Sequence, residues 1–151
     1  VDQDGKTWTE KSLLGKYAIV YFGYTYCPDA CPTALIAISQ ALDELGPKAA
    51  KFLPVFVTID PERDTVKQIG AYVRTVDDRL VGLTGSAEQV ARAAKAYRVF
   101  YRKVTPEGSA EYLMDHTSLI YLMGPDGKYV AHFSHEMPVE KIVETLRRYA
   151  G

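Results

Sequence analysis

Short apolar runs and helical spacings alternate along the chain. Residues 17–23 form an apolar run rich in β-formers, which predicts a buried strand. Behind this run, apolar residues recur at helical spacing over residues 31–45, and Gly46-Pro47 closes the pattern. Residues 52–59 are again apolar and predict a second strand. Because a strand, a helix and a strand in this order require a crossover, we expect the two strands to be parallel.

Two capping-box sequences predict the next helices. Thr65-Val66-Lys67-Gln68 opens a helix that runs to about residue 74. After a short strand at residues 80–83, Ser86-Ala87-Glu88-Gln89 opens another helix. In both boxes the sequence predicts that the hydroxyl and the glutamine side chain cap each other's backbone N–H groups.

The rest of the chain predicts strands joined by turns. Four further runs have strand character, at residues 101–104, 111–114, 118–123 and 128–133. The first two flank Pro106-Glu107-Gly108-Ser109 and are expected to form an exposed hairpin. The last two are joined by the turn Gly124-Pro125-Asp126-Gly127 and are expected to be antiparallel neighbours in the core. Pro138 opens a last helix with an apolar inner face.

This order of elements is the thioredoxin-like layout of the α/β class. A mixed central sheet is flanked by helices, and the chain's paired cysteines fall at the first strand-to-helix junction. Asp4-Gly5-Lys6 predicts an additional N-terminal hairpin, and the hairpin within residues 101–114 is an insertion. No repeat, low-complexity tract or linker divides the chain, so we expect residues 1–151 to form a single domain.

Composition and charge exclude several classes of function. The chain is 47% hydrophobic and 25% charged, which is typical of a globular protein. A net charge of −1, without a basic run interleaved with aromatic residues, argues against a nucleic-acid partner. No stretch approaches the roughly 20 apolar residues of a membrane span. We expect the abrupt start at Val1 to reflect a trimmed chain from which an N-terminal anchor has been removed.

Cys27 and Cys31 are the only two cysteines, and they follow the first strand directly. Four residues make one helical turn, so both sulfur atoms face the same side if a helix begins here. A helix N-terminus stabilises thiolates, and Pro28 and Pro32 stiffen the loop. The pair can therefore form a disulfide, act as a dithiol reductant or provide two sulfur ligands for a soft metal such as copper or zinc.

A metal held by two thiolates needs a further ligand, and His116 is the best candidate among the three histidines. It precedes the strand predicted at residues 118–123, and in a thioredoxin-like layout the loop entering that strand passes beside the paired cysteines. Asp115 or a backbone carbonyl then holds the other ring nitrogen. The alternative is an ordinary surface histidine; taken together with the two cysteines, a Cys2His set is favoured.

At this point the sequence resembles a known family, the Sco/SenC proteins. The resemblance rests on motifs in family order and spacing over nearly the whole chain, namely Phe22-Gly23-Tyr24-Thr25-Tyr26-Cys27-Pro28-Asp29-Ala30-Cys31-Pro32, Asp60-Pro61-Glu62-Arg63-Asp64-Thr65, Leu83-Thr84-Gly85, Asp115-His116-Thr117, Tyr121-Leu122 and Gly127. It implies a domain that binds one copper ion, as Cu(I) or Cu(II), through Cys27, Cys31 and His116.

The resemblance also implies a role in assembling a respiratory enzyme. Family members act as copper donors, as reductants or as both at the binuclear copper site of cytochrome c oxidase subunit II. Other copper proteins and thioredoxin-like reductants are further expected partners. The family is tethered by an N-terminal membrane helix and faces the bacterial periplasm or the mitochondrial intermembrane space; the inner-membrane-anchored periplasmic form is the expectation here.

Two enzymatic alternatives share the fold. In a thiol-disulfide reductase, Cys27 attacks a partner disulfide and Cys31 resolves the mixed disulfide, while His116 only tunes the sulfur atoms. Such an enzyme would keep the copper-ligand cysteines of the oxidase subunit reduced. A thiol peroxidase is disfavoured because Thr25 has the wrong spacing for the threonine that accompanies a peroxidatic cysteine.

Three acidic residues are candidates for a supporting role around the metal or for docking a partner. Asp60 and Asp64 follow the second strand, at the sheet end that carries the cysteine loop if the strands are parallel. The structural alternative is that Thr65 or Asp64 caps a helix and that Arg63 pairs with a carboxylate. Asp29, inside the cysteine loop, is expected to accept hydrogen bonds from N–H groups of the loop or helix. The functional alternatives are that it opposes full thiolate formation at the cysteines or meets a partner.

Aromatic and histidine side chains complete the candidate residues. We expect Tyr24 and Tyr26 to wall the cysteine site and to limit its access to solvent. His132 and His135 have no cysteine or paired carboxylate close by in sequence. We interpret them as solvent-exposed histidines rather than as a second metal site.

Overall fold

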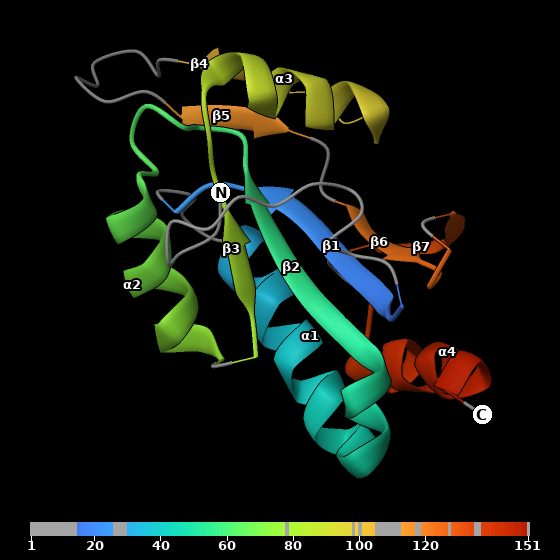
Figure 1. Ribbon diagram of the computed structural model, residues 1–151. Coiled ribbons are helices and arrows are strands. Elements are labelled where there is room, and N and C mark those ends of the chain that lie inside the picture. Colours follow the sequence, from blue (N-terminus) through green and yellow to red (C-terminus); the bar gives the residue numbers. More distant parts are fainter. Residues whose placement is uncertain are drawn as a thin grey trace.

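Five strands form a mixed sheet through the middle of the molecule, in the order β3-β2-β1-β6-β7 (Figure 1). Their bounds are β1 (Tyr17–Gly23), β2 (Phe52–Thr58), β3 (Val81–Leu83), β6 (Leu119–Met123) and β7 (Tyr129–Ser134). The structure is a computed structural model that describes residues 15–25, 30–77, 79–97, 99, 101–104, 113–116, 119–126, 128–134 and 137–150. Only the main chain is described at residues 30–33, 101–104, 113–116 and 150.

The strand directions agree with the prediction from the sequence. β1 and β2 are parallel, with a register that runs from Tyr17↔Phe52 to Gly23↔Thr58, and β3 is parallel to β2. β6 is antiparallel to β1, and β7 is antiparallel to β6. The carboxyl ends of β1, β2 and β3 therefore lie at the same end of the sheet as the start of β6. We call this end the carboxyl end of the sheet.

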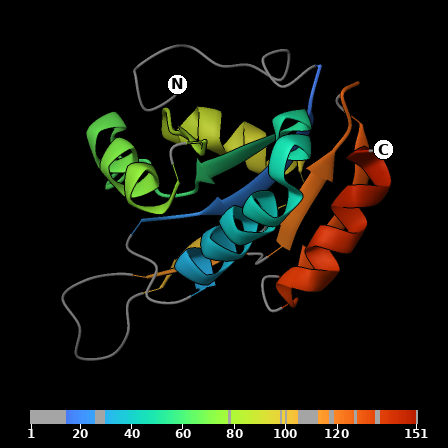
Figure 2. The same cartoon turned by 90° about the horizontal axis from the view of Figure 1, so that it is seen from below.

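Helices cover both faces of the sheet. They are α1 (Ala30–Leu45), α2 (Val66–Val76), α3 (Ala87–Ala96) and α4 (Val139–Ala150), with a short 3-10 helix η2 (Gly46–Lys51) after α1. Tyr17 and Phe22 of β1 point to opposite faces because side chains alternate along a strand. Tyr17 contacts Tyr149 of α4, with ring centroids 5.8 Å apart, whereas Phe22 contacts Tyr97 after α3 at 5.1 Å. α1 lies beside α4 (Figure 2), so these two helices share one face and α3 covers the other.

The predicted apolar faces form the core. Strand β1 is buried over residues 18–23, as expected for an apolar strand that helices cover on both sides. The inner positions of α1 and α4 are also buried, namely Leu35, Ile38, Ala41, Leu42, Leu45, Ile142, Val143 and Leu146. This core fixes the start of α1 relative to the end of β1, where the cysteine pair occurs in the sequence.

The two predicted capping boxes differ in the structure. The box at Ser86 is complete: the Ser86 hydroxyl accepts from the Gln89 N–H at 3.1 Å, and the Gln89 side chain accepts from the Ser86 N–H at 3.0 Å. At Thr65 only the hydroxyl half forms, with the Gln68 N–H as donor at 3.3 Å. The predicted second half is wrong, because the Gln68 side chain donates instead to the Thr25 hydroxyl at 3.0 Å. This hydrogen bond ties α2 to the residues that follow β1.

The inserted hairpin is confirmed, and its second strand continues two residues beyond the predicted end at Met114, while residues 111 and 112 lie outside the described residues. β4 (Tyr101–Val104) pairs antiparallel with β5 (Leu113–His116), in a register from Tyr101↔His116 to Val104↔Leu113. The sequence predicted residues 111–114 because a short apolar pattern does not fix hairpin register, which depends on the turn. This extension places His116 at the last position of a strand, rather than in the loop where it was predicted.

These elements form the predicted thioredoxin-like α/β fold, a mixed sheet with helices on both faces and an inserted hairpin. The predicted N-terminal hairpin around Asp4-Gly5-Lys6 lies outside the described residues. Among the helices of the described ranges, none combines the length and the apolar character that crossing a bilayer requires.

Candidate metal centre

Two of the three predicted ligands, Cys31 and His116, belong to elements whose main chain the structure describes. Cys31 is the second residue of α1, which follows β1 along the chain. His116 ends β5, and β6 begins three residues later at Leu119. Because β6 pairs with β1 in a register that includes Tyr21↔Ile120, the start of β6 lies beside the carboxyl end of β1. The end of β1 and the start of β6, three residues after His116, therefore lie at one end of the sheet.

Residues 26–29 of the cysteine loop lie outside the described residues, and with them the predicted roles of Tyr26, Cys27 and Asp29. The main chain of Asp115 pairs with Arg102 in the inserted hairpin, next to His116.

The 16-residue α1 directs the positive end of its dipole toward its first turn, which includes Cys31. The positive end of a helix dipole stabilises anions, thiolates among them.

Asp64 has a buried carboxylate at the same end of the sheet. Its side chain accepts from the Thr25 N–H at 3.0 Å, from the Thr25 hydroxyl at 2.6 Å and from the Thr58 hydroxyl at 2.6 Å. The residue is fully buried, and burial raises the pKa of the Asp64 carboxyl, while the hydrogen bonds from Thr25 and Thr58 act in the opposite direction. The carboxylate thus links the chain after β1 to the end of β2.

Asp60 forms an ion pair beside Tyr24. The Arg63 guanidinium lies 2.5 Å from the Asp60 carboxylate and 5.7 Å from the centroid of the Tyr24 ring. Tyr24 and Asp60 are each 2% exposed. A cation that stacks on a ring and pairs with a buried carboxylate stabilises both groups. This cluster supports the chain segment that leads into the cysteine loop.

The structural interpretation of the Asp60–Thr65 motif is confirmed in two respects. Thr65 is the N-cap of α2, and Arg63 pairs with Asp60. Asp64 is not the cap; it is directed into the domain, where it binds two threonines. Because both aspartates are buried and hydrogen-bonded inside the domain, their geometry favours internal support of the loop over docking of a partner.

Sequence reasoning missed Thr25 and Thr58 as parts of this network. Thr58 is the last residue of β2, and Thr25 lies two residues after the end of β1. The two strand ends are neighbours, because Gly23 pairs with Thr58 in the sheet. A threonine at the end of an otherwise apolar strand is a weak signal for a polar partner. This signal points to Asp64 as the polar partner only once β1 and β2 are known to be parallel and in this register.

Within the described ranges, no three metal-binding side chains form a cluster. His132 is exposed on β7, as predicted, and its Nδ1 shares a hydrogen bond with the Tyr129 hydroxyl. His135 lies outside the described residues.

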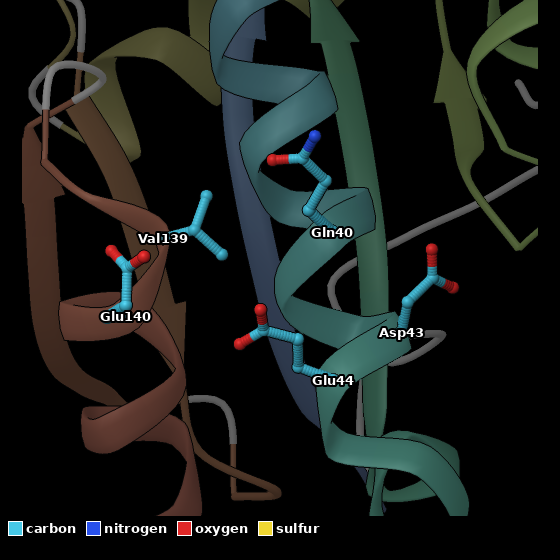
Figure 3. A pocket seen from close by; sticks show the side chains of 5 residues that line it. All are labelled: Gln40, Asp43, Glu44, Val139 and Glu140. Carbon is cyan, nitrogen blue, oxygen red and sulfur yellow. The ribbon is translucent and has the colours of Figure 1, made fainter.

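A shallow groove of about 480 Å³ runs between α1 and α4 and is lined by Gln40, Asp43, Glu44, Val139 and Glu140 (Figure 3). It contains none of the predicted site residues.

The fold and the site define a class of protein, a thioredoxin-like domain with a cysteine pair at its first strand-to-helix junction. A family model described as SCO1/SenC matches residues 1–151, and the chain belongs to this family. Among curated proteins it is 42% identical to "Protein SCO1 homolog 1, mitochondrial" of Arabidopsis thaliana over 99% of this chain. The match takes in 46% of that protein, so the chain spans about half the length of this curated relative.

Two solved structures resemble the chain along nearly its full length. The crystal structure of Arabidopsis thaliana ScoI with copper bound has a TM-score of 0.92 and 40% identity, and the match covers 99% of this chain and 93% of that one. The structure of Bradyrhizobium japonicum ScoI with copper bound has a TM-score of 0.90 and 44% identity, and the match covers 99% and 94%. Both of these relatives contain bound copper.

Proposed function

We propose that this chain is a copper metallochaperone that holds one copper ion through Cys27, Cys31 and His116, with residues 1–151 as one copper-binding domain. One observation carries the proposal: the main chain directs the end of β5 and the end of β1 to the same end of the sheet. The copper-bound relatives, at 40% and 44% identity, support the choice of metal. Two thiolates and an imidazole form a soft donor set that suits Cu(I).

The proposed ligand set explains how the metal would be passed on. Three protein ligands leave copper accessible to a thiolate of the partner, so the metal can move by stepwise ligand exchange. Oxidation of Cys27 and Cys31 to a disulfide would remove two of the three ligands. The two electrons released by this oxidation would reduce a partner disulfide to two thiols. Copper release and thiol oxidation would therefore be coupled.

We propose cytochrome c oxidase subunit II as the recipient, with its binuclear copper site as the destination. We further propose that the protein works in the bacterial periplasm, attached to the inner membrane. The mitochondrial intermembrane space is the alternative, and the Arabidopsis relative is named as mitochondrial. A compartment outside the reducing cytosol fits a cysteine pair that must alternate between dithiol and disulfide.

Anaerobic Cu(I) titration of the reduced protein against a competing chelator tests the proposal. The wild type should hold one copper tightly. His116→Ala should weaken binding by more than the roughly 10- to 100-fold that loss of an outer-sphere partner costs. His132→Ala is the matched control, because His132 is exposed on β7 and should leave the affinity unchanged. Equal affinities for the two variants would contradict the proposed ligand set.

A thiol-disulfide reductase is the second candidate function. The observation that favours it is the position of Cys31 in the first turn of α1, where the helix dipole stabilises a thiolate. Reduction of a disulfide in the oxidase subunit would then need Cys27 and Cys31 but not His116. If copper-free His116→Ala supports oxidase assembly as well as the wild type, while Cys31→Ser does not, the reductase is the main function.

A further inference from the structure

Asp64 is the residue in which hydrogen bonds from the ends of two parallel strands converge. Thr25 follows β1, and Thr58 ends β2. Both threonines donate to the Asp64 carboxylate, and the Thr25 N–H adds a third hydrogen bond. The backbone carbonyl of Asp64 also accepts from the Thr84 hydroxyl, just after β3, at 2.6 Å. Asp64 therefore joins the carboxyl ends of three neighbouring strands.

The direction of each hydrogen bond requires an acceptor at Asp64. The Thr58 hydroxyl accepts from the Asp60 N–H at 2.9 Å, so its own proton is directed to Asp64. The Thr25 hydroxyl accepts from the Gln68 side chain at 3.0 Å, so its proton is also directed to Asp64. A carboxylate accepts at both oxygens, whereas an asparagine would turn its NH2 group toward a donor. Replacing Asp64 by asparagine therefore breaks the network without changing the shape of the side chain.

The network acts on the chain just before the cysteine pair. Thr25 is two residues before Cys27, and both its backbone and its side chain are bound to Asp64. The Ile59 N–H donates to the Gly23 carbonyl at 2.8 Å, which holds the preceding residues of the same segment. Buried hydrogen bonds to a charged group are among the stronger ones in proteins. The direction in which the chain leaves β1 is thus fixed from the side of β2 and α2.

We propose that Asp64 is a positioning residue for the cysteine pair: its carboxylate holds Thr25 and so fixes the point from which the chain runs to Cys27. This inference rests on the proposed function only where it concerns copper binding. The effect of Asp64 on the positions of the sulfur atoms does not depend on any metal. Ligands whose supports are fixed bind metals more tightly than ligands that must be ordered on binding.

The test compares Asp64→Asn with Asp77→Asn in the full chain. Asp77 is a matched control, since its carboxylate also accepts from a hydroxyl, that of Ser39 at 2.6 Å, but at the opposite end of α2. Copper affinity should fall by roughly 10- to 100-fold in Asp64→Asn and stay unchanged in Asp77→Asn. In reduced, copper-free protein, the rate at which iodoacetamide alkylates Cys27 should change in Asp64→Asn alone, as followed by mass spectrometry.

Variants of Thr25 carry the test if Asp64→Asn does not fold. Thr25→Val keeps the shape and the backbone N–H but loses the hydroxyl, whereas Thr25→Ser keeps both hydrogen-bonding groups. We expect weaker copper binding and altered alkylation in the valine variant, and recovery of both in the serine variant. The proposal is overturned if folded Asp64→Asn, or Thr25→Val, matches Asp77→Asn in both measurements.

The two readouts separate this proposal from the proposed function. If alkylation of Cys27 responds to Asp64→Asn while copper binding does not depend on His116, the positioning role stands and the metallochaperone is wrong. If copper binding depends on His116 while Asp64→Asn changes neither affinity nor alkylation, the metallochaperone stands and the positioning role is wrong.

Discussion

Asp77 and Asp64 are two carboxylates that the domain stabilises in different ways. Asp64 accepts hydrogen bonds from neutral groups, and its burial raises the pKa of its carboxyl. Asp77 accepts from the Arg79 guanidinium at 2.6 and 2.9 Å and from the Ser39 hydroxyl at 2.6 Å. The hydrogen bond with Arg79, more than that with Ser39, holds the pKa of the Asp77 carboxyl well below its usual range. Asp77 thereby fastens the chain after α2 to the middle of α1.

The low pKa of Asp77 predicts a loss of stability in acid. Because the folded-state pKa lies below the ordinary value of 3.8, the ionised Asp77 stabilises the fold above that pH, and this contribution is lost as the pH falls further. At neutral pH, Asp77→Asn should lower the free energy of unfolding by about 1–2 kcal/mol. Urea unfolding at a series of pH values should show the difference from the wild type shrinking in acid. A difference that stays constant would contradict the role given to Asp77.

At the scale of residues, the sequence predicted the contacts that are close along the chain. The pairing of Arg63 with Asp60 and the capping of α2 by Thr65 follow from spacings of a few residues. The hydrogen bond between Thr25 and Asp64 spans 39 positions and depends on the register of two strands. No local pattern specifies such a contact, so the supporting network of the cysteine loop was not predictable.

At the scale of elements, α2 lies beside β3 (Figure 1). The two elements approach each other closely at Gly82. A Cβ atom added at Gly82 would lie 2.3 Å from Cγ2 of Ile69 and 3.0 Å from Cγ1 of Val73. Both atoms belong to buried side chains of α2, so neither can move without disturbing the core. The absence of a side chain at Gly82 is what allows α2 to lie against β3.

Gly82→Ala should therefore destabilise the domain. Overpacking of this kind typically costs about 1–3 kcal/mol, because the neighbouring side chains or the helix must shift. The free energy of unfolding from urea titration measures the effect. In an Ile69→Ala background the closest atom is gone, and the same glycine substitution should cost clearly less. Equal costs in the two backgrounds would show that Ile69 is not the obstacle.

The sequence predicted helices and strands most accurately where the hydrophobic pattern agrees with the capping or turn residues that mark the ends of the element. The bounds of β1 match the prediction, and the complete capping box at Ser86 opens α3 as expected. The end of β5 was predicted two residues too early, because nothing in a short apolar strand specifies its register against β4. The difference matters for the site, since it makes His116 a strand residue.

At the scale of the whole molecule, the parallel strands and the antiparallel β6 bring distant segments to one end of the sheet. Cys31 and His116 are far apart in sequence, yet the elements that carry them connect to the paired strands β1 and β6. The element order alone predicted this meeting of segments, because it determines which strand ends coincide. The ligand set itself stays a prediction, since it depends on side chains rather than on topology.

X-ray absorption at the copper edge of the reduced, copper-loaded protein tests the proposed ligand set. We predict two sulfur ligands and one nitrogen ligand per copper, and loss of the nitrogen ligand in His116→Ala. A copper ion with only nitrogen and oxygen ligands would contradict it. So would a wild-type ligand set that survives the replacement of His116.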